Sequence, residues 1–124
     1  MKTYIEIEEK KKEYDEKYDK LEMENPKDID TLNVYGDWVD LLDEFLIWNL
    51  TSYAEKIGFD LSKDYDEIFE FTDEAKREML ISEDEARNRL LALEKEISNN
   101  TRLSKRHLAL LKDEADVLKW ILED

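Results

Sequence analysis

The sequence predicts an all-α protein, a small helical bundle with a long central helix and a C-terminal αα-hairpin. Only two glycines and one proline occur in 124 residues, although the turns between strands depend on such residues. Apolar residues also recur at steps of three and four along most of the chain, which is the period of a helix buried on one side. At this length we expect one acidic helical domain, residues 1–124.

The first predicted element is an exposed helix over residues 3–24. Lys11 interrupts its apolar stripe, which is made of Tyr4, Ile5, Ile7, Tyr14, Tyr18 and Leu21. A minor alternative is a two-stranded ribbon, because Ile5 and Ile7 alternate with glutamates. Its partner strand would be residues 68–71, so the ribbon would pair residues 3–8 with that segment.

The second element is a central helix over residues 26–57. Asn25 is a suitable N-cap and Pro26 suits the first helical position. Gly58 stands where a helix commonly ends in a left-handed residue. Such a helix would be about 48 Å long, so we expect a break or kink near Gly36. It is apolar over more than half its circumference.

Two further elements complete the chain. Residues 62–80 keep helical spacing and form an acidic helical segment. Ser82 and Glu85 have the spacing of a capping box, which predicts a helix start at that point. Beyond it, leucines at alternating steps of three and four predict an αα-hairpin over residues 83–122 with coiled-coil-like seams.

No motif in the chain predicts catalysis, a cofactor or a metal. His107 is the only histidine and cysteine is absent, so we expect a structural or exposed role for that side chain. Residues 60–71 place oxygen-bearing side chains at several positions of a calcium loop. However, Tyr65 replaces the required glycine and Phe71 replaces the bidentate glutamate. Phosphate-binding glycine loops and nucleophile elbows are missing, so the protein is not expected to be an enzyme.

The charge of the chain is concentrated in its middle. The net charge is −15, and residues 25–74 contribute −11 of it through 14 acidic and 3 basic side chains. That region also holds nine of the thirteen aromatic residues. An acidic field repels nucleic acid and anionic membranes but attracts basic proteins. We therefore expect a basic protein partner, no direct nucleic-acid or membrane contact and, without a signal-like or spanning apolar stretch, a cytoplasmic location.

The stretch DWVDLLDEFLIWNL, residues 37–50, combines both features. Leu41, Leu42, Phe45 and Leu46 are its expected core residues. The carboxylates are expected to form an outward row, and at least one tryptophan is expected at the surface, where an aromatic ring among charges is a typical binding hot spot. The predicted partner-binding residues are Asp37, Trp38, Asp40, Asp43, Glu44, Trp48, Asp60, Asp64, Asp66, Glu67, Glu70, Asp73 and Glu74.

In charge, size and class, the chain is similar to the acidic DNA mimics that phages and mobile elements use against restriction enzymes, CRISPR nucleases or polymerases. That likeness implies a viral anti-CRISPR or antirestriction inhibitor that occupies the basic surface of a nucleic-acid-handling protein, in the host cytoplasm if phage-encoded. One alternative is a coiled-coil-like adaptor or oligomerisation module, with a homodimer possible through the leucine seams. Another is an immunity protein that neutralises a basic toxin. In the simplest interpretation, the acidic surface serves only to keep the protein soluble.

Overall fold

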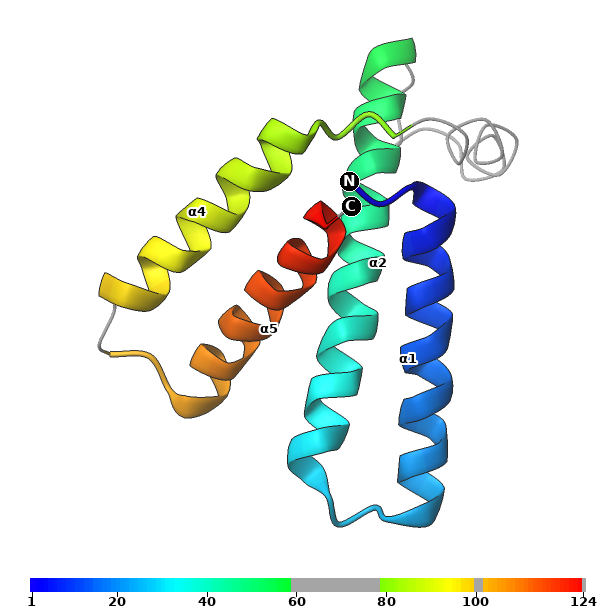
Figure 1. Cartoon of the computed structure of the whole chain (residues 1–124), viewed down its shortest axis with the longest axis vertical. Helices are drawn as coiled ribbons and strands as arrows, with labels where there is room; N and C mark the ends of the chain where they lie inside the picture. The colour runs from blue at the N-terminus through cyan, green and yellow to red at the C-terminus, as the bar shows by residue number, and fades with distance from the viewer. Residues whose placement is uncertain (59–78, 100–101, 124) are drawn as a thin grey trace.

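The computed structural model describes residues 1–58, 79–99 and 102–123, and these ranges contain four helices and no strand (Figure 1). The helices are α1 (Tyr4–Glu24), α2 (Ile29–Ile57), α4 (Glu83–Asn99) and α5 (Lys105–Leu122). The prediction of an all-α bundle with a long central helix and a C-terminal hairpin is confirmed. The acidic segment 62–80 lies outside the described residues except for its last two positions, which are not helical.

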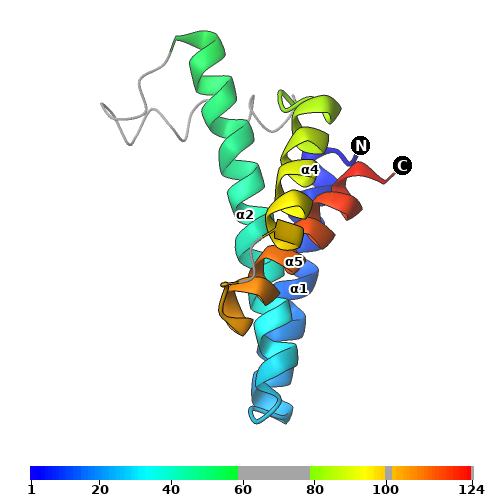
Figure 2. The same cartoon turned by 90° about the vertical axis from the view of Figure 1, so that its left-hand side faces the viewer.

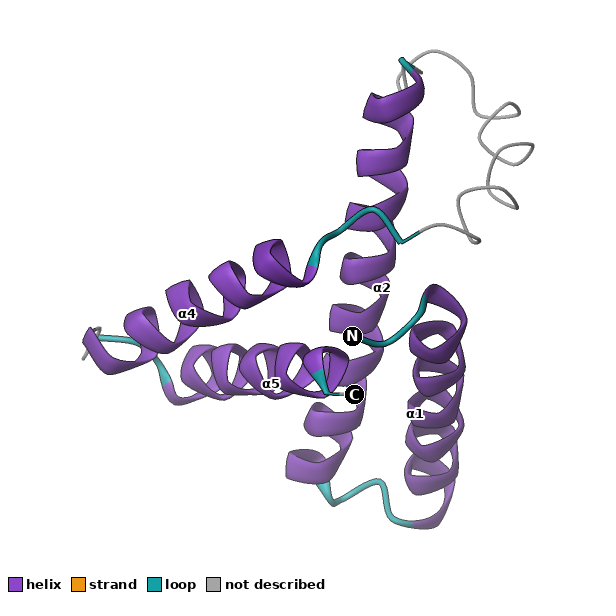
Figure 3. Cartoon of the chain, turned by 45° about the horizontal axis from the view of Figure 1, so that its top comes forward, coloured by secondary structure: helices purple, strands orange, loops and turns teal. Residues whose placement is uncertain are grey.

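Helix α2 is the axis of the molecule. Helix α1 runs antiparallel beside it, and α5 packs obliquely against it from another side (Figures 1 and 3). Helix α4 packs on α5, and this hairpin runs obliquely away from the α1–α2 pair (Figure 1), in front of which it lies in Figure 2. The two ends of the chain lie close together in all three views, and the Lys2 amide donates a hydrogen bond of 2.7 Å to the carbonyl of Ile121.

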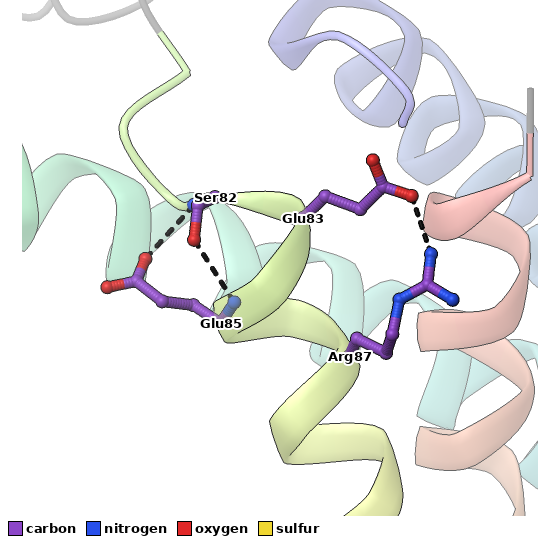
Figure 4. A network of polar contacts seen from close by, with 4 residues as sticks. All are labelled: Ser82, Glu83, Glu85 and Arg87. Carbon is purple, nitrogen blue, oxygen red and sulfur yellow. Dashed lines mark hydrogen bonds and ion pairs between the residues drawn. The ribbon is translucent and has the colours of Figure 1, made fainter.

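All four described helices are capped at their starts by side chains from the sequence positions just before them, and Asp28 caps α2. Thr3 and Glu6 form a capping box at α1, and Ser104 accepts a hydrogen bond from the His107 amide at α5. At α4 the predicted capping box is confirmed, because the Ser82 hydroxyl accepts from the Glu85 amide and the Glu85 carboxylate accepts from the Ser82 amide (Figure 4). These local bonds satisfy backbone N–H groups that have no partner within the helix.

The predicted start of the central helix is wrong by three residues. Asn25 does not cap α2; its amide instead donates 2.7 Å to the carbonyl of Leu21 and so ends α1. Pro26 lies in the turn between the helices. The N-cap of α2 is Asp28, whose carboxylate accepts from the Thr31 amide. The chain needs these residues to reverse direction, so they cannot also be helical.

The expected break near Gly36 is also wrong, since α2 is continuous from Ile29 to Ile57. A glycine in a helix costs about 1 kcal/mol relative to alanine, and packing against α1 offsets that cost. The ring of Tyr18 comes to 3.5 Å from the position that a Cβ at Gly36 would take. Gly58 does end the helix as predicted, with φ of 73° in the left-handed region.

The ribbon alternative fails at its first strand, because residues 4–8 belong to α1. Tyr4 and Ile7 are buried three residues apart on one helical face, whereas Ile5 is 61% exposed. A strand would have placed Ile5 and Ile7 on the same side. Its other strand, residues 68–71, lies outside the described residues.

The core lies where α1, α2 and α5 meet, with α4 closing one side. Ile7, Leu42 and Ile121 are among its fully buried side chains. Asn49 is buried with them, and its side-chain oxygen accepts hydrogen bonds of 2.7 Å from the Leu80 amide and 3.2 Å from the Ile81 amide. A buried polar group of this kind is tolerated because it is hydrogen-bonded, and it fixes the chain before α4 against α2.

Replacing Leu93 by Asp tests the hairpin seam. Leu93 is 6% exposed while Leu91, two residues away on α4, is 57% exposed. Leu93→Asp should lower the free energy of unfolding by about 3 kcal/mol or more, because it buries a charge without a partner. Leu91→Asp is the matched control and should change it by less than about 0.5 kcal/mol. Urea unfolding followed by circular dichroism measures both, and equal values would show that the seam is not buried.

Candidate partner-binding site

Residues 37–50 form the middle of α2, and the four side chains expected in the core are buried there: Leu41, Leu42, Phe45 and Leu46. The carboxylates of the same stretch have three different environments. Three residues of α-helix turn the chain by about 300°, so side chains at every third position spiral around the helix and do not share a face. The three aspartates of this stretch therefore have different surroundings.

Asp37 is not part of an outward row, contrary to the prediction. Its residue is only 5% exposed, and its two carboxylate oxygens accept hydrogen bonds from the two terminal nitrogens of Arg106 on α5, one of them at 2.8 Å. This two-bond geometry is the strongest form of a carboxylate–arginine pair. The aspartate belongs to the α2–α5 contact, because α5 covers that side of α2.

Asp43, at the other end of the spiral, faces α1. The ammonium group of Lys11 lies 2.7 Å from its carboxylate. Lys11 is the residue that interrupts the apolar stripe of α1, so the interruption serves this contact. Both side chains stay partly exposed, and such pairs contribute about 1 kcal/mol or less. The outward carboxylates that remain on this stretch are Asp40 and Glu44.

Asp40, Glu44 and Trp48 stand four residues apart, so they follow one another along a single face of α2. Both carboxylates are exposed, and Trp48 is half-buried with its ring edge against Phe45 at 5.6 Å between centroids. We call these three residues the α2 strip. Trp38 lies elsewhere: it is half-buried and stacks on Tyr14 of α1, with centroids 4.7 Å apart and planes 11° apart. Its ring belongs to the α1–α2 contact.

Two residues of the α2 strip, Glu44 and Trp48, line a cavity of about 200 Å³ between α2, α4 and α5. Its walls are mainly apolar and its rim carries two carboxylates and one guanidinium. The lining residues are Leu41, Glu44, Phe45, Trp48, Arg89, Glu114, Val117 and Leu118. Arg89 and Glu114 come from the C-terminal hairpin, and nothing in their local sequence indicated a role beside Trp48.

A second acidic residue, Asp113, adjoins Asp37 and Arg106. Burial acts to raise the pKa of Asp37, but hydrogen bonds from Arg106 and Asp113 outweigh it, so that pKa lies below its ordinary value. For Asp113, burial raises the pKa, and the hydrogen bond and charge of Asp37 add to it, to about 7. When Asp113 is protonated it can donate to the Asp37 carboxylate, and the two acids and Arg106 then form one clasp between α2 and α5.

The other predicted partner-binding residues lie outside the described residues: Asp60, Asp64, Asp66, Glu67, Glu70, Asp73 and Glu74. The calcium-loop-like residues 60–71 lie there too. His107 is exposed in the first turn of α5. Within the described ranges, no three histidine or acidic side chains gather to hold a metal ion. No helix of those ranges combines the length and apolarity that a membrane crossing needs.

Comparison of the chain with protein families, with characterised proteins and with solved structures found no match. The α2 strip and the adjoining cavity join exposed carboxylates to a half-buried aromatic ring.

The clasp predicts a pH dependence of stability. Because the pKa of Asp113 is higher in the folded state, its contribution to stability is full below its ordinary pKa of 3.8 and is lost as pH rises through about 7. Asp37 acts oppositely, and its contribution is lost as pH falls below about 4. Asp113→Asn donates to Asp37 at every pH, so it should raise the free energy of unfolding at pH 8 by about 1–2 kcal/mol, a value reduced for partial solvent exposure.

Urea unfolding at pH 5 and at pH 8 measures this effect. Asp40→Asn makes the same charge change at an exposed position of α2 and should leave the pH dependence as it is in the wild type. If Asp113→Asn and Asp40→Asn give the same profile, Asp113 does not share a proton with Asp37.

Proposed function

We propose that this chain is a small acidic inhibitor that binds the basic surface of a nucleic-acid-handling protein. The observation that carries the proposal is the α2 strip, in which Asp40 and Glu44 stay exposed in line with the half-buried ring of Trp48. Aromatic anchors surrounded by polar groups are typical of binding hot spots. A basic partner would meet the two carboxylates first and then the apolar surface of the ring.

The distribution of charge over the helices supports this proposal. Residues 1–58 carry 16 acidic and 8 basic side chains, a net charge of −8. Residues 79–99 and 102–123 together carry 9 acidic and 8 basic side chains, a net charge of −1. The α1–α2 pair is thus the acidic half of the described fold, and a field of this kind accelerates encounter with a basic partner.

The pairing of Asp37 and Asp43 changes the form of the proposed mimicry. On α2 the predicted row of four carboxylates is reduced to two that face solvent without an ion-pair partner among the described residues, Asp40 and Glu44. Two carboxylates do not make a charged row along α2. The proposal rests on charge attraction combined with an aromatic anchor, and it places the protein in the cytoplasm beside its target.

One alternative, an oligomerisation module, needs leucine seams that are free to pair with another chain. Leu93, Leu111 and Leu118 of those seams are buried inside this chain. These leucines pack inside the chain's own core and are not free to pair with another chain, which favours the inhibitor over the adaptor. An immunity protein against a basic toxin would use the same surface and differs only in its target.

Charge reversal on the α2 strip tests the proposal. The immobilised wild-type chain should capture basic nucleic-acid-binding proteins from a bacterial lysate, and added DNA duplex should release them, as identified by mass spectrometry. Asp40→Lys with Glu44→Lys should reduce that capture by about tenfold or more, because the local charge changes by four units. Trp48→Ala should weaken binding by about 2 kcal/mol, mainly through a faster off-rate.

The matched control is Glu9→Lys with Glu96→Lys, which makes the same charge change at exposed positions of α1 and α4. Circular dichroism checks that each variant folds. Equal loss of capture in the two double variants would mean that only total charge matters. Capture that DNA duplex does not release would rule out a shared binding surface, and the proposed inhibitor mechanism with it.

A further inference from the structure

The guanidinium of Arg89 lies at the mouth of the cavity beside Trp48. The Cζ atom of Arg89 is 6.0 Å from the centroid of the Trp48 ring, within the range of a cation–π contact. Its Nε and Nη2 donate hydrogen bonds of 3.1 and 2.7 Å to a single carboxylate oxygen of Glu114. An arginine side chain from α4 thus bridges an aromatic wall from α2 and a carboxylate from α5.

The two members of this ion pair differ in exposure. The side chain of Arg89 is 54% exposed, whereas that of Glu114 is 15% exposed. Exposed ion pairs contribute little to stability, so Arg89 can leave this position at small cost. Glu114 is the more enclosed partner, because it stands on α5 beside buried core residues and lines the cavity.

The cavity suits one basic side chain. At about 200 Å³ it is smaller than the roughly 300–1,000 Å³ of small-molecule sites. Its apolar walls, among them Phe45 and Leu118, match the methylene stem of an arginine, whose stem packs on apolar surface while its head stays polar. Glu44 and Glu114 give the rim two negative charges against the one positive charge of Arg89.

We infer that this cavity receives an arginine side chain of a basic protein partner. In the free protein the guanidinium of Arg89 occupies the place, between Glu114 and Trp48, that the incoming guanidinium takes, and so acts as an internal competitor. The inference rests on the proposed function for the class of partner. It adds the residue type that is recognised and a built-in competitor that sets the affinity. The incoming guanidinium pairs with Glu114, stacks on Trp48 and releases Arg89 to solvent. Glu44, at the same rim, adds a second negative charge near the incoming group.

A capped pentapeptide with one arginine between glycines is a sufficient probe. Its counterpart with citrulline, which has the same shape without the charge, is the control ligand. NMR titration follows the indole N–H signal of Trp48, assigned among the three tryptophans of the chain by substitution. The arginine peptide should move that signal and the citrulline peptide should not.

Arg89→Gln should increase affinity for the arginine peptide by about two- to fivefold, because an internal competitor lowers apparent affinity by the fraction of time it fills the site. Arg87→Gln is the matched control: Arg87 is an exposed arginine two residues away whose ion pair is with Glu83 (Figure 4). It should leave the affinity unchanged. Glu114→Gln should remove arginine binding.

Thermal unfolding establishes that the variants fold. If the Arg89→Gln variant does not fold, Arg89→Lys replaces it. Lysine keeps the charge but cannot donate from two fixed nitrogens to one carboxylate oxygen as Arg89 does. Equal affinity of the Arg87 and Arg89 variants would overturn the inference, as would equal binding of arginine and citrulline peptides. A titration that leaves the Trp48 signal in place would also overturn it.

These outcomes are separate from those that test the proposed function. If the peptide fails to bind while lysate capture still depends on Asp40 and Glu44, the arginine site is wrong and the acidic inhibitor stands. If the peptide binds as expected while DNA duplex fails to release captured proteins, the arginine site stands and the nucleic-acid-competing inhibitor is wrong.

Discussion

The fold depends on one constraint: a single helix, α2, has to bury apolar side chains on more than one side. A helix that is apolar over most of its circumference needs several neighbours to cover it. Helix α1 covers one side and α5 covers another, and α4 packs mainly on α5. Asn49 adds the contact that ties the chain before α4 to α2. The wide apolar surface of α2 thus determines where the other helices pack.

The same arrangement decides which acidic residues are available to a partner. Where α5 covers α2, Asp37 pairs with Arg106, and where α1 approaches it, Asp43 pairs with Lys11. The face left between them carries Asp40 and Glu44. Within residues 37–50, the carboxylates that stay exposed are those that do not pair with a neighbouring helix. The proposed binding strip lies on the face of α2 that α1 and α5 leave uncovered.

Helix α5 is held by charge on two sides as well as by apolar packing. Arg106 pairs with Asp37 of α2, while Glu114 pairs with Arg89 of α4. In the first pair the carboxylate is buried while the Arg106 side chain is 52% exposed, and with Asp113 this pair makes the α2–α5 contact sensitive to pH. The second is exposed on the arginine side and borders the cavity beside Trp48. Both arginines are about half exposed, so the position beside the cavity, rather than burial, distinguishes the pair that a partner can exchange.

Helix existence, type and several ends could be read from local sequence. The Ser82–Glu85 capping box and the left-handed Gly58 are short-range patterns that act within a few residues, so the sequence alone determined them. The same holds for the burial of Leu42 and Phe45, which follows from helical period. The start of α2 was missed because Asn25 suits either end of a helix, and only the turn decided between them.

The site itself was decided by tertiary structure. The sequence concentrated charge and tryptophan in residues 37–50, but it could not show that Arg106, 69 positions from Asp37, would neutralise the first carboxylate of the row. Arg89 and Glu114, 25 positions apart, likewise meet at Trp48 only because α4 and α5 pack side by side near α2. Ion pairs between distant helices depend on crossing geometry and long side chains, and local spacing records neither of these.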